Sequence, residues 1–374
     1  MAAPNNDYHT RTCDLLPRIS EAAGQIDRER KLPKDLADEL KNQGFFRLLV
    51  PKSLGGTELD YLKYLDIIET FATADGSTAW CLNQGNGFAT RSAVMPEPLA
   101  RELFGDHNTV IANGPPAGAT ATPVDNGYTL TGRWLFSSGF PHANWIGAIA
   151  PIKDTGKPIM CMVPKESVEC IDIWQVSGLR GTGSFGFEIH DLFVPTERTF
   201  NQEAPSREDG PLYTFPTTLF FASGYASVAL GVARAGLDAA INLANTKKPA
   251  GQKDLLRDKP ITQQQIGHAE ATWRSAKAYL RQSAESAWQS AKTTGTFTPA
   301  EHTHIRLSGT HAIRQAAKVI DIAYNICGSH AIFETDPIHR RFQDIHAITQ
   351  QTQGRMSHYE TTGQFFLDSK SKGI

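Results

Sequence analysis

The sequence predicts an α+β protein in which a helical part is followed by a β part and then by a helical bundle. Three observations support this order. Apolar residues recur at helical spacing up to about residue 108, short β-rich runs fill residues 109–215, and the helical period returns from Pro216 to the end. With 374 residues the chain is long enough for two or three structural units. We therefore expect three domains, at residues 1–108, 109–215 and 216–374.

The first part, residues 1–108, is expected to be a helical domain. Leu32, Leu36 and Leu40 recur four residues apart, Pro33 suits a first helical turn, and Gly44 suits a C-terminal cap. A further helix is expected over YLKYLDIIETFATAD, and another begins near GSTAW.

The second part, residues 109–215, is expected to be a small β-sandwich or barrel. Its β-rich runs are TVIANG, GYTLTGRWLFSSG, NWIGAIAPI, IMCMVP, CIDIWQV and FGFEIHDLFVP. Gly, Pro, Asn and Asp separate these runs, and several short strands in a row are typical of a β-domain.

The third part, residues 216–374, is expected to be a four-helix bundle that also serves oligomerisation. The run TTLFFASGYASVALGVARAGLDAAINLANTKK is rich in Ala and Gly, which permits close approach of helices. A later run carries one apolar stripe, made of Ile305, Ala312, Ile313, Ala316, Val319, Ile320, Ala323 and Ile326. Helices of this kind have more apolar surface than one small bundle covers, so we expect self-association.

Composition excludes several classes of function. The 37 basic and 39 acidic side chains leave neither a basic stripe for nucleic acid nor a polybasic patch for a membrane. Five dispersed cysteines indicate reduced thiols, and no metal site is predicted. The first 19 residues have no apolar core of signal-peptide length, and no stretch approaches the roughly 18 apolar residues of a membrane span. We therefore expect a cytoplasmic protein.

Four motifs in this order resemble the acyl-CoA dehydrogenase superfamily. They are GFFRLLVPKSLGGTELDYLKYLDIIETFATADGSTAW, GYTLTGRWLFSSGFPHANW, GLRGTGSFGFEIHDLFVP and DPIHRRFQDIHAI. The resemblance implies an N-terminal helical domain, a middle β-domain over the flavin and a C-terminal four-helix bundle. It also implies a dimer of dimers, so we expect a homotetramer.

Further details resemble one branch, the two-component flavin-dependent monooxygenases. They are SSG and HAEATWRSAKAYLRQSAESAW, with LRDKP ahead of it. The resemblance implies an enzyme that receives reduced FMN or FAD from a separate flavin reductase. Such an enzyme forms a C4a-hydroperoxyflavin with O2 and oxygenates a small organic substrate at an aromatic, nitrogen or sulfur centre. No GxGxxG string stands at a strand-to-helix turn and no P-loop occurs, which fits an enzyme that borrows its electrons.

The resemblance also assigns residues to the flavin ring. Ser137 or Ser138 is expected to bond N5 or O4 of the ring, because the oxidation states of a flavin differ in hydrogen bonding there. The alternative for this pair is a plain turn at the end of a strand. Asn113 and Gly114 fall where the first β-segment of the family meets the ring.

A second flavin contact is expected from LLRDKPITQ. Arg257 and Gln263 match residues that hold the phosphate or adenosine end of the flavin in relatives, often from a neighbouring subunit. The alternative is a solvated loop of mixed charges.

The catalytic candidates are Ser138, His142 and Gln351. His142, in GFPHANW, either handles a substrate proton or caps local backbone groups. Acyl-CoA dehydrogenases use a glutamate after the Arg-Asp motif, but after Asp344 this chain reads HAITQQTQG. Many monooxygenase relatives place a histidine at the position we align with Gln351, and glutamine cannot replace either base.

The predicted substrate contacts are Trp80, Gln84, Asn86 and His346. The substrate is expected between the GSTAWCLNQGNG helix, which lacks a histidine often found there, and the segment 346–360. Chemistry without a strong base favours an amine, a sulfur atom, or an already acidic phenol or indole. Two alternatives stay open: a dehydrogenase or oxidase with tightly held FAD that acts on a non-standard substrate, and a non-catalytic flavin- or ligand-binding homologue.

Overall fold

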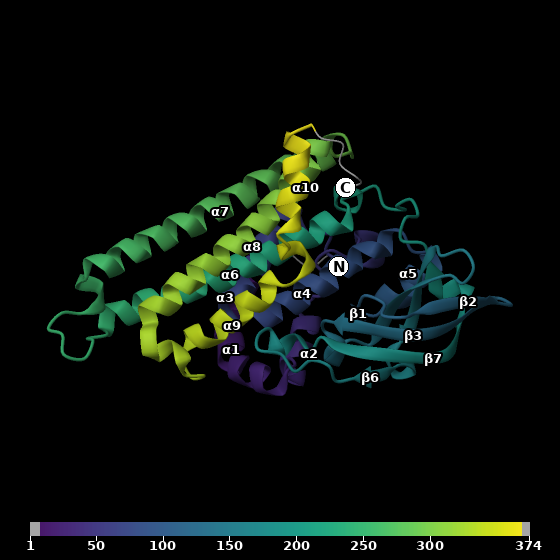
Figure 1. Cartoon of the computed structure of the whole chain (residues 1–374). Coiled ribbons are helices and arrows are strands. Elements are labelled where there is room, and N and C mark those ends of the chain that lie inside the picture. Colours follow the sequence, from purple (N-terminus) through teal and green to yellow (C-terminus); the bar gives the residue numbers. More distant parts are fainter. Residues whose placement is uncertain (1–7, 369–374) are drawn as a thin grey trace.

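The structure, a computed structural model, describes residues 8–368 and has the predicted order of helices, strands and helices (Figure 1). The first seven residues of the segment searched for a signal peptide lie outside this range. The α+β class with helical ends and a middle sheet domain is confirmed. The N-terminal helices are α1 (Tyr8–Glu29), α2 (Lys34–Asn42), α3 (Tyr61–Ala74), α4 (Gly76–Ala89) and α5 (Glu97–Phe104).

Local chemistry explains where these helices begin. The expected turn and cap at α2 are present: Pro33 precedes its first residue, Leu36 and Leu40 are buried, and Gly44 has φ 78°. The carboxylate of Asp60 accepts from the backbone of Leu62 and Lys63 at the start of α3. Asp75 accepts from Thr78 at the start of α4, as an N-cap residue does.

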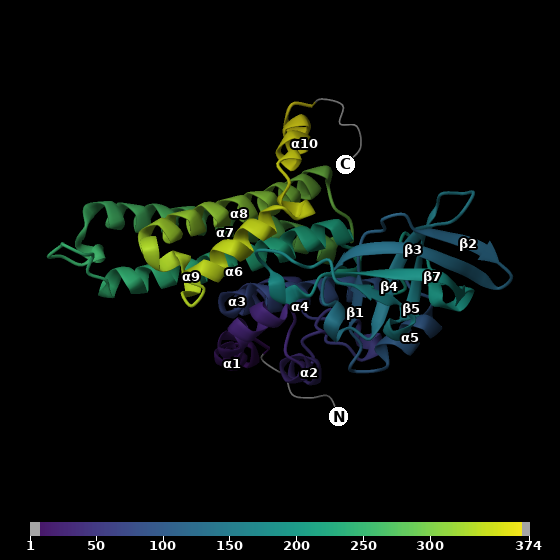
Figure 2. The same ribbon diagram turned by 60° about the horizontal axis from the view of Figure 1, so that its bottom comes forward.

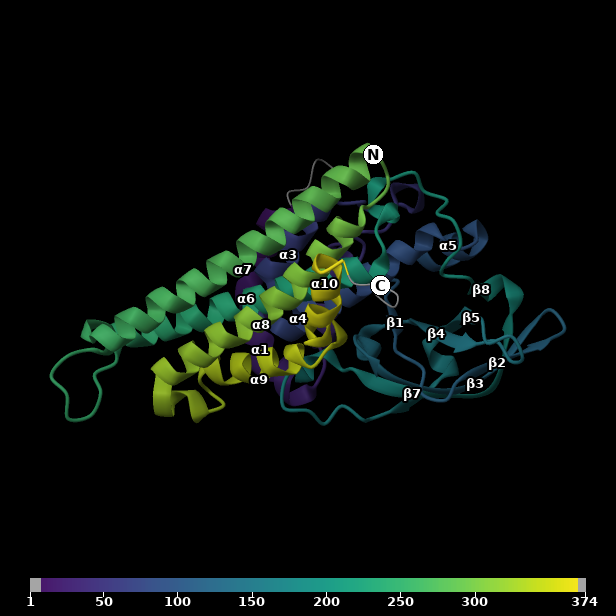
Figure 3. The same ribbon diagram turned by 45° about the horizontal axis from the view of Figure 1, so that its top comes forward.

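The β part consists of two four-stranded sheets that lie side by side (Figure 3). One has the order β1-β4-β5-β8 and the other β2-β3-β7-β6. Their bounds are β1 Ile111–Asn113, β2 Thr120–Val124, β3 Gly127–Ser137, β4 Trp145–Pro151, β5 Pro158–Pro164, β6 Glu169–Ile171, β7 Phe185–Pro195 and β8 Thr199–Phe200. The pairing of β3 with β7 shifts register between Trp134 and Ser137, so β3 ends at an irregularity beside the helices.

The C-terminal part is a bundle of long helices, from which α10 stands off (Figure 2). Its helices are α6 (Thr217–Thr246), α7 (Pro260–Thr293), α8 (Pro299–Cys327), α9 (Pro337–Thr349) and α10 (Ser357–Phe366). The predicted stripe of α8 is buried along its length. A Cβ added at Gly231 would lie 2.2 Å from the carbonyl oxygen of Glu69, so glycine lets α6 approach α3 closely.

The sequence predictions were wrong at three points. CIDIWQV was expected to be a strand, but only Glu169–Ile171 pairs and the rest is irregular. The short strand β2 was missed, because TATPV contains a proline. The statement about membrane spans also needs correction: α6 is long and apolar enough to cross a membrane by composition, but 89% of that window is buried inside the fold. Burial on this scale is typical of the central helix of a bundle.

Candidate functional site

Helix α4 contacts the end of strand β3 through Trp80. The indole Nε1 of Trp80 donates to Oγ of Ser138 at 3.0 Å, and both side chains are buried. Trp80 lies near the start of α4, which the Asp75 cap fixes, and Ser138 follows the last residue of β3. The structure thus brings together a predicted substrate contact and a predicted flavin contact.

A chain of three hydroxyl groups continues from Ser138 into the β part. Oγ of Ser138 lies 2.7 Å from Oγ of Ser184, which lies 2.7 Å from Oγ1 of Thr182. Oγ1 of Thr182 lies 2.8 Å from the carbonyl oxygen of Leu179. Thr182 and Ser184 were not among the predicted site residues, although they are two hydroxyl residues at alternate positions of GLRGTGS.

The groups at the two ends of this series of hydroxyls, the Leu179 carbonyl and the Trp80 indole, fix the direction of every hydrogen bond between them. The carbonyl of Leu179 can only accept, so Thr182 donates to it. Because each hydroxyl has one hydrogen, Ser184 then donates to Thr182, and Ser138 donates to Ser184. The indole of Trp80 can only donate, and it donates to Ser138. Ser138 therefore has one remaining lone pair and no free hydrogen, and it can act only as an acceptor toward a further partner.

A second link between α4 and the β part runs through Gln84. Its Nε2 donates to Oδ1 of Asn113 at 2.8 Å, and its Oε1 accepts a short hydrogen bond from the hydroxyl of Tyr225 on α6. The ring of Tyr225 stacks on Trp80 with centroids 4.0 Å apart, and on Phe221 with centroids 5.7 Å apart. Tyr225 and Phe221 were not among the predicted site residues, although two aromatic residues four apart among Ala, Ser and Gly could have indicated them.

Gly114 and Ser137 lie against each other beside this group. A Cβ at Gly114 would lie 2.0 Å from the carbonyl oxygen of Leu135 and 2.7 Å from Oγ of Ser137, so only glycine fits. Oγ of Ser137 is buried and has no hydrogen-bond partner among residues 8–368. A buried hydroxyl without a partner is costly in a finished core, and it is available to a bound group.

His142 is buried in the turn after β3. It follows Gly139, whose φ of 83° favours glycine, and its ring centroid lies 5.3 Å from that of Phe46. In the part of the chain that the structure describes, neither ring nitrogen has a hydrogen-bond partner, so the ring does not cap the local backbone. Burial, with smaller effects of Lys41 and Lys165, lowers the pKa of His142 to about 3. The imidazole is therefore neutral and a weak proton acceptor at neutral pH.

Three other predicted residues have partners elsewhere. Gln351 is the N-cap of the turn Thr352–Gly354, where its Oε1 accepts from the backbone of Gln353 at 2.6 Å. His346 lies 2.9 Å from the carboxylate of Asp321 on α8. The amide of Asn86 bonds backbone groups of Leu49, Phe45 and Leu82 and is fully buried. Their predicted roles stay predictions, and the contacts of this single chain give each a structural role.

Of the two residues predicted to hold the far end of the flavin, Arg257 lies between α6 and α7 and Gln263 lies in the first turn of α7. Nε2 of Gln263 donates to the carbonyl oxygen of Arg257 at 3.0 Å. The guanidinium of Arg257 is exposed and lies 3.8 Å from the carboxylate of Asp258. Gln263 and Arg257 are thus already in contact with each other, and the exposed guanidinium can bind a further group.

Asp344 joins the three parts of the chain behind the site. Its Oδ1 accepts from the backbone of Leu179 at 2.6 Å, and its Oδ2 would lie 3.3 Å from a Cβ at Gly76. Burial, with the nearby carboxylate of Asp75, raises the pKa of Asp344 to about 7. Asp344 of α9 therefore holds the loop that carries Thr182 and Ser184.

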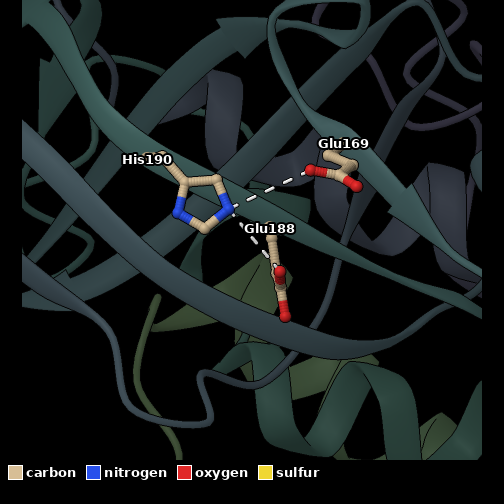
Figure 4. A group of neighbouring side chains, drawn as sticks. All are labelled: Glu169, Glu188 and His190. Atoms are coloured by element: carbon tan, nitrogen blue, oxygen red, sulfur yellow. Dashed lines mark ion pairs between the residues drawn. The ribbon is translucent and has the colours of Figure 1, made fainter.

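A cluster of ionisable side chains lies on the exposed face of the β3-β7-β6 sheet (Figure 4). Nε2 of His190 lies 3.6 Å from Glu188 and 4.0 Å from Glu169, and Glu188 also lies 3.5 Å from Arg133. These side chains alternate with the buried Phe187 on β7, so they belong to the solvated side of the sheet. We interpret them as surface ion pairs.

Comparison with known proteins adds independent evidence on the family. Residues 17–95 match the acyl-CoA dehydrogenase N-terminal domain, and residues 223–354 match the acyl-CoA dehydrogenase C-terminal domain. The chain is 33% identical to an indole-3-acetate monooxygenase of Pseudomonas putida, over 94% of this chain and 92% of that one. It is 28% identical to the oxygenase subunit HsaA, a flavin-dependent monooxygenase of Rhodococcus jostii, over 89% of this chain and 91% of that one. Among solved structures, the 3-HSA hydroxylase of Rhodococcus sp. RHA1 superposes with a TM-score of 0.91 at 25% identity, covering 99% of this chain and 98% of the other.

Proposed function

The chain belongs to the acyl-CoA dehydrogenase family, among the oxygenase components of flavin-dependent monooxygenases, and from this premise we propose that it oxygenates a planar aromatic substrate with electrons from a reduced flavin. The observation that carries the proposal is the double contact of Trp80. Its indole N–H bonds Ser138 at the end of β3, and its ring stacks on Tyr225 of α6. One side chain thus links the predicted flavin contact to an aromatic wall.

The residues at the end of β3 fit a flavin ring. Oγ of Ser137 is buried without a partner, Ser138 has one lone pair left, and Gly114 leaves room where a Cβ would collide. Ser137, Ser138, Asn113 and Gly114 would hold the ring. When bound, a reduced flavin supplies two electrons, so that one atom of O2 enters the substrate and the other leaves as water.

The protein's own contribution is to orient the substrate and to exclude water. The rings of Trp80, Tyr225 and Phe221 provide a stacking surface, and the amide of Gln84 is held between Tyr225 and Asn113. His142 stays neutral, and Gln351 is a cap rather than a base. A site with so little base strength favours an electron-rich ring, and a relative at 33% identity is named for indole-3-acetate.

The direct test is isotopic. The purified chain, mixed anaerobically with reduced FMN or FAD and indole-3-acetate, is exposed to 18O2. We expect one labelled oxygen atom in each product molecule and one molecule of reduced flavin consumed per product. Reduced flavin that is consumed only to form hydrogen peroxide, whichever aromatic substrate is present, would contradict the proposal. A Trp80→Phe variant keeps an aromatic ring, loses the bond to Ser138, and should lower the yield of product per flavin.

Assembly and location are part of the proposal. The C-terminal helix α10 stands off the bundle, and Met356, Phe366 and Leu367 around it are exposed (Figure 2). Apolar side chains placed in this way support association of several copies, and we propose a homotetramer in which Arg257 and Gln263 face a neighbouring subunit. Light scattering on the purified chain tests the mass.

The free cysteines fit a reducing compartment, so we propose a cytoplasmic protein that receives reduced flavin from a separate reductase.

A further inference from the structure

Arg91 lies two residues beyond the end of α4, and its guanidinium group has no counterion among residues 8–368. It belongs to the short turn Thr90–Ala93, and its one hydrogen bond within these residues runs from Nη1 to the carbonyl oxygen of Gln202 at a long 3.5 Å. Its Nε is buried, without a partner in the described part of the chain, and burial lowers the pKa of Arg91. A charged donor that is withdrawn from water without a partner is costly and calls for a reason.

Two other buried or partly buried arginines, Arg47 and Arg314, are satisfied by the backbone. Arg47 donates to the carbonyl oxygens of Asp106 and Leu54 at 3.0 and 2.9 Å. Arg314 donates to those of Gly354 and Thr349 at 2.8 and 3.1 Å. These bonds tie loops to helices, whereas the single weak bond of Arg91 holds little in place. A purely structural role therefore fits Arg47 and Arg314 better than Arg91.

Arg91 continues the face of α4 that carries Trp80 and Gln84, two of the predicted substrate contacts. Trp80, Gln84, Gly87 and Arg91 are spaced by four, three and four residues, which places them in one row along a helix. The backbone stays helical through the junction, with φ −59° and ψ −26° at Ala89. With a rise of 1.5 Å per residue, Arg91 lies about 10 Å beyond Gln84 along the row.

The row on α4 faces a row of aromatic rings on α6. Trp80 stacks on Tyr225, Gln84 bonds the hydroxyl of Tyr225, and a Cβ at Gly87 would lie 2.4 Å from the ring of Phe221. The rings of Phe221 and Tyr225 are nearly parallel, with 13° between their planes. Flat apolar surfaces thus lead from Trp80 toward the end of α4 where Arg91 lies.

We propose that Arg91 binds the carboxylate of an aromatic acid whose ring lies along the Phe221, Tyr225 and Trp80 side chains. The inference deepens the proposed function and rests on it, because it names the substrate class of that same site. A guanidinium binds a carboxylate through two parallel charge-assisted hydrogen bonds, and the ligand supplies the counterion that the chain lacks. The three aromatic side chains would contact the ring of the ligand, and Gln84 would supply one polar contact near that ring. Indole-3-acetate is an anion of this class.

The test compares an acid with its neutral isostere. Indole-3-acetate and indole-3-acetamide are titrated by calorimetry into the chain, both flavin-free and saturated with reduced flavin under anaerobic conditions. For Arg91→Met we expect the affinity for the acid to fall about 10- to 100-fold and the affinity for the amide to change little, since hydrogen bonds to charged groups carry this much free energy. Arg91→Lys keeps the charge but loses the paired N–H donors of the guanidinium, and it should retain part of the preference for the acid over the amide. Arg101→Gln, which removes an exposed arginine paired with Glu97, is the matched control.

Thermal unfolding distinguishes a ligand-binding role of Arg91 from a structural role. If Arg91 serves a ligand, Arg91→Met removes an unpaired buried charge and should leave the unfolding midpoint of the ligand-free chain unchanged or raise it. A variant that unfolds at lower temperature and loses both ligands equally would overturn the proposal, as would one that binds both ligands like the wild type. If the wild type binds the acid through Arg91 but forms no oxygenated product, the proposed function is contradicted, whereas carboxylate binding by Arg91 is confirmed.

Discussion

The Oγ atoms of Ser138 and Ser184 lie 2.7 Å apart, and the hydrogen between them belongs to Ser138. This direction follows from Thr182, whose hydroxyl donates its hydrogen to the carbonyl of Leu179 and therefore accepts from Ser184. Ser138 is thereby an acceptor toward any further partner, and the family resemblance predicts that Ser137 or Ser138 bonds N5 or O4 of the flavin. N5 carries an N–H in a reduced flavin and only a lone pair in an oxidised one, so a Ser138 that meets N5 would favour the reduced form.

Ser184→Ala should reduce this preference. Without its acceptor, the hydroxyl of Ser138 can turn and donate outward, so the ratio of the dissociation constants of oxidised and reduced flavin should fall about fivefold, the value of one hydrogen bond. Anaerobic titrations with both forms measure the ratio. Thr182→Val should act in the same direction and Thr182→Ser should not. Ser92→Ala, which removes another buried hydroxyl bonded to a backbone carbonyl, is the control. An unchanged ratio in Ser184→Ala would refute this role for the chain of hydroxyls.

Gln351→Ala should affect stability more than catalysis. The side chain caps the turn Thr352–Gly354, and loss of such a cap costs about 1 kcal/mol. We expect a lower unfolding midpoint, measured by calorimetry, and a turnover number close to that of the wild type. Gln351→Asn keeps an acceptor and should restore most of the stability. A large loss of turnover at unchanged stability would instead return Gln351 to the catalytic residues.

His142→Phe should make the protein less sensitive to acid. The pKa of His142 is about 3 in the folded chain and its usual value is 6.5, because burial disfavours the charged form. The unfolded chain therefore takes up a proton that the folded chain refuses, so stability is lost as the pH falls from about 6.5 toward 3, by up to about 1.4 kcal/mol per pH unit. Phenylalanine suits the contact with Phe46 and removes this loss. Unfolding midpoints between pH 4 and 8 measure the difference, and parallel curves for the two proteins would rule out this account.

Asp344→Asn should have the opposite pH signature. The pKa of Asp344 is raised from 3.8 to about 7 by burial and by the neighbouring Asp75. The folded chain thus holds a proton that the unfolded chain releases, so this group's contribution is present below about pH 4 and is lost as the pH rises to about 7. Asparagine keeps an acceptor for the backbone of Leu179 without a charge. We expect the variant to gain stability relative to the wild type as the pH rises from 5 to 7, and a constant difference would contradict the assignment.

The sequence by itself determined the fold and the kind of enzyme. The apolar periods of α2 and α8, the cap residues beside α3 and α4, and the alternating strands depend on neighbours a few residues away, which a sequence displays directly. Local motifs also placed Gly114 and Ser137 at the ends of two strands, and the structure brings these two residues against each other.

The tertiary structure alone decided which side chains meet. Tyr225 contacts Gln84 across 141 positions of sequence, and Ser138 contacts Ser184 across 46, so neither pairing leaves a local pattern. Gln351, Asn86 and His346 match the expected motif positions, yet the packed chain uses their polar atoms for a cap, a buried loop and an ion pair. Partners for buried polar groups are set by packing across the whole chain, and so the direction of the Ser138 hydroxyl and the missing counterion of Arg91 become visible only in three dimensions.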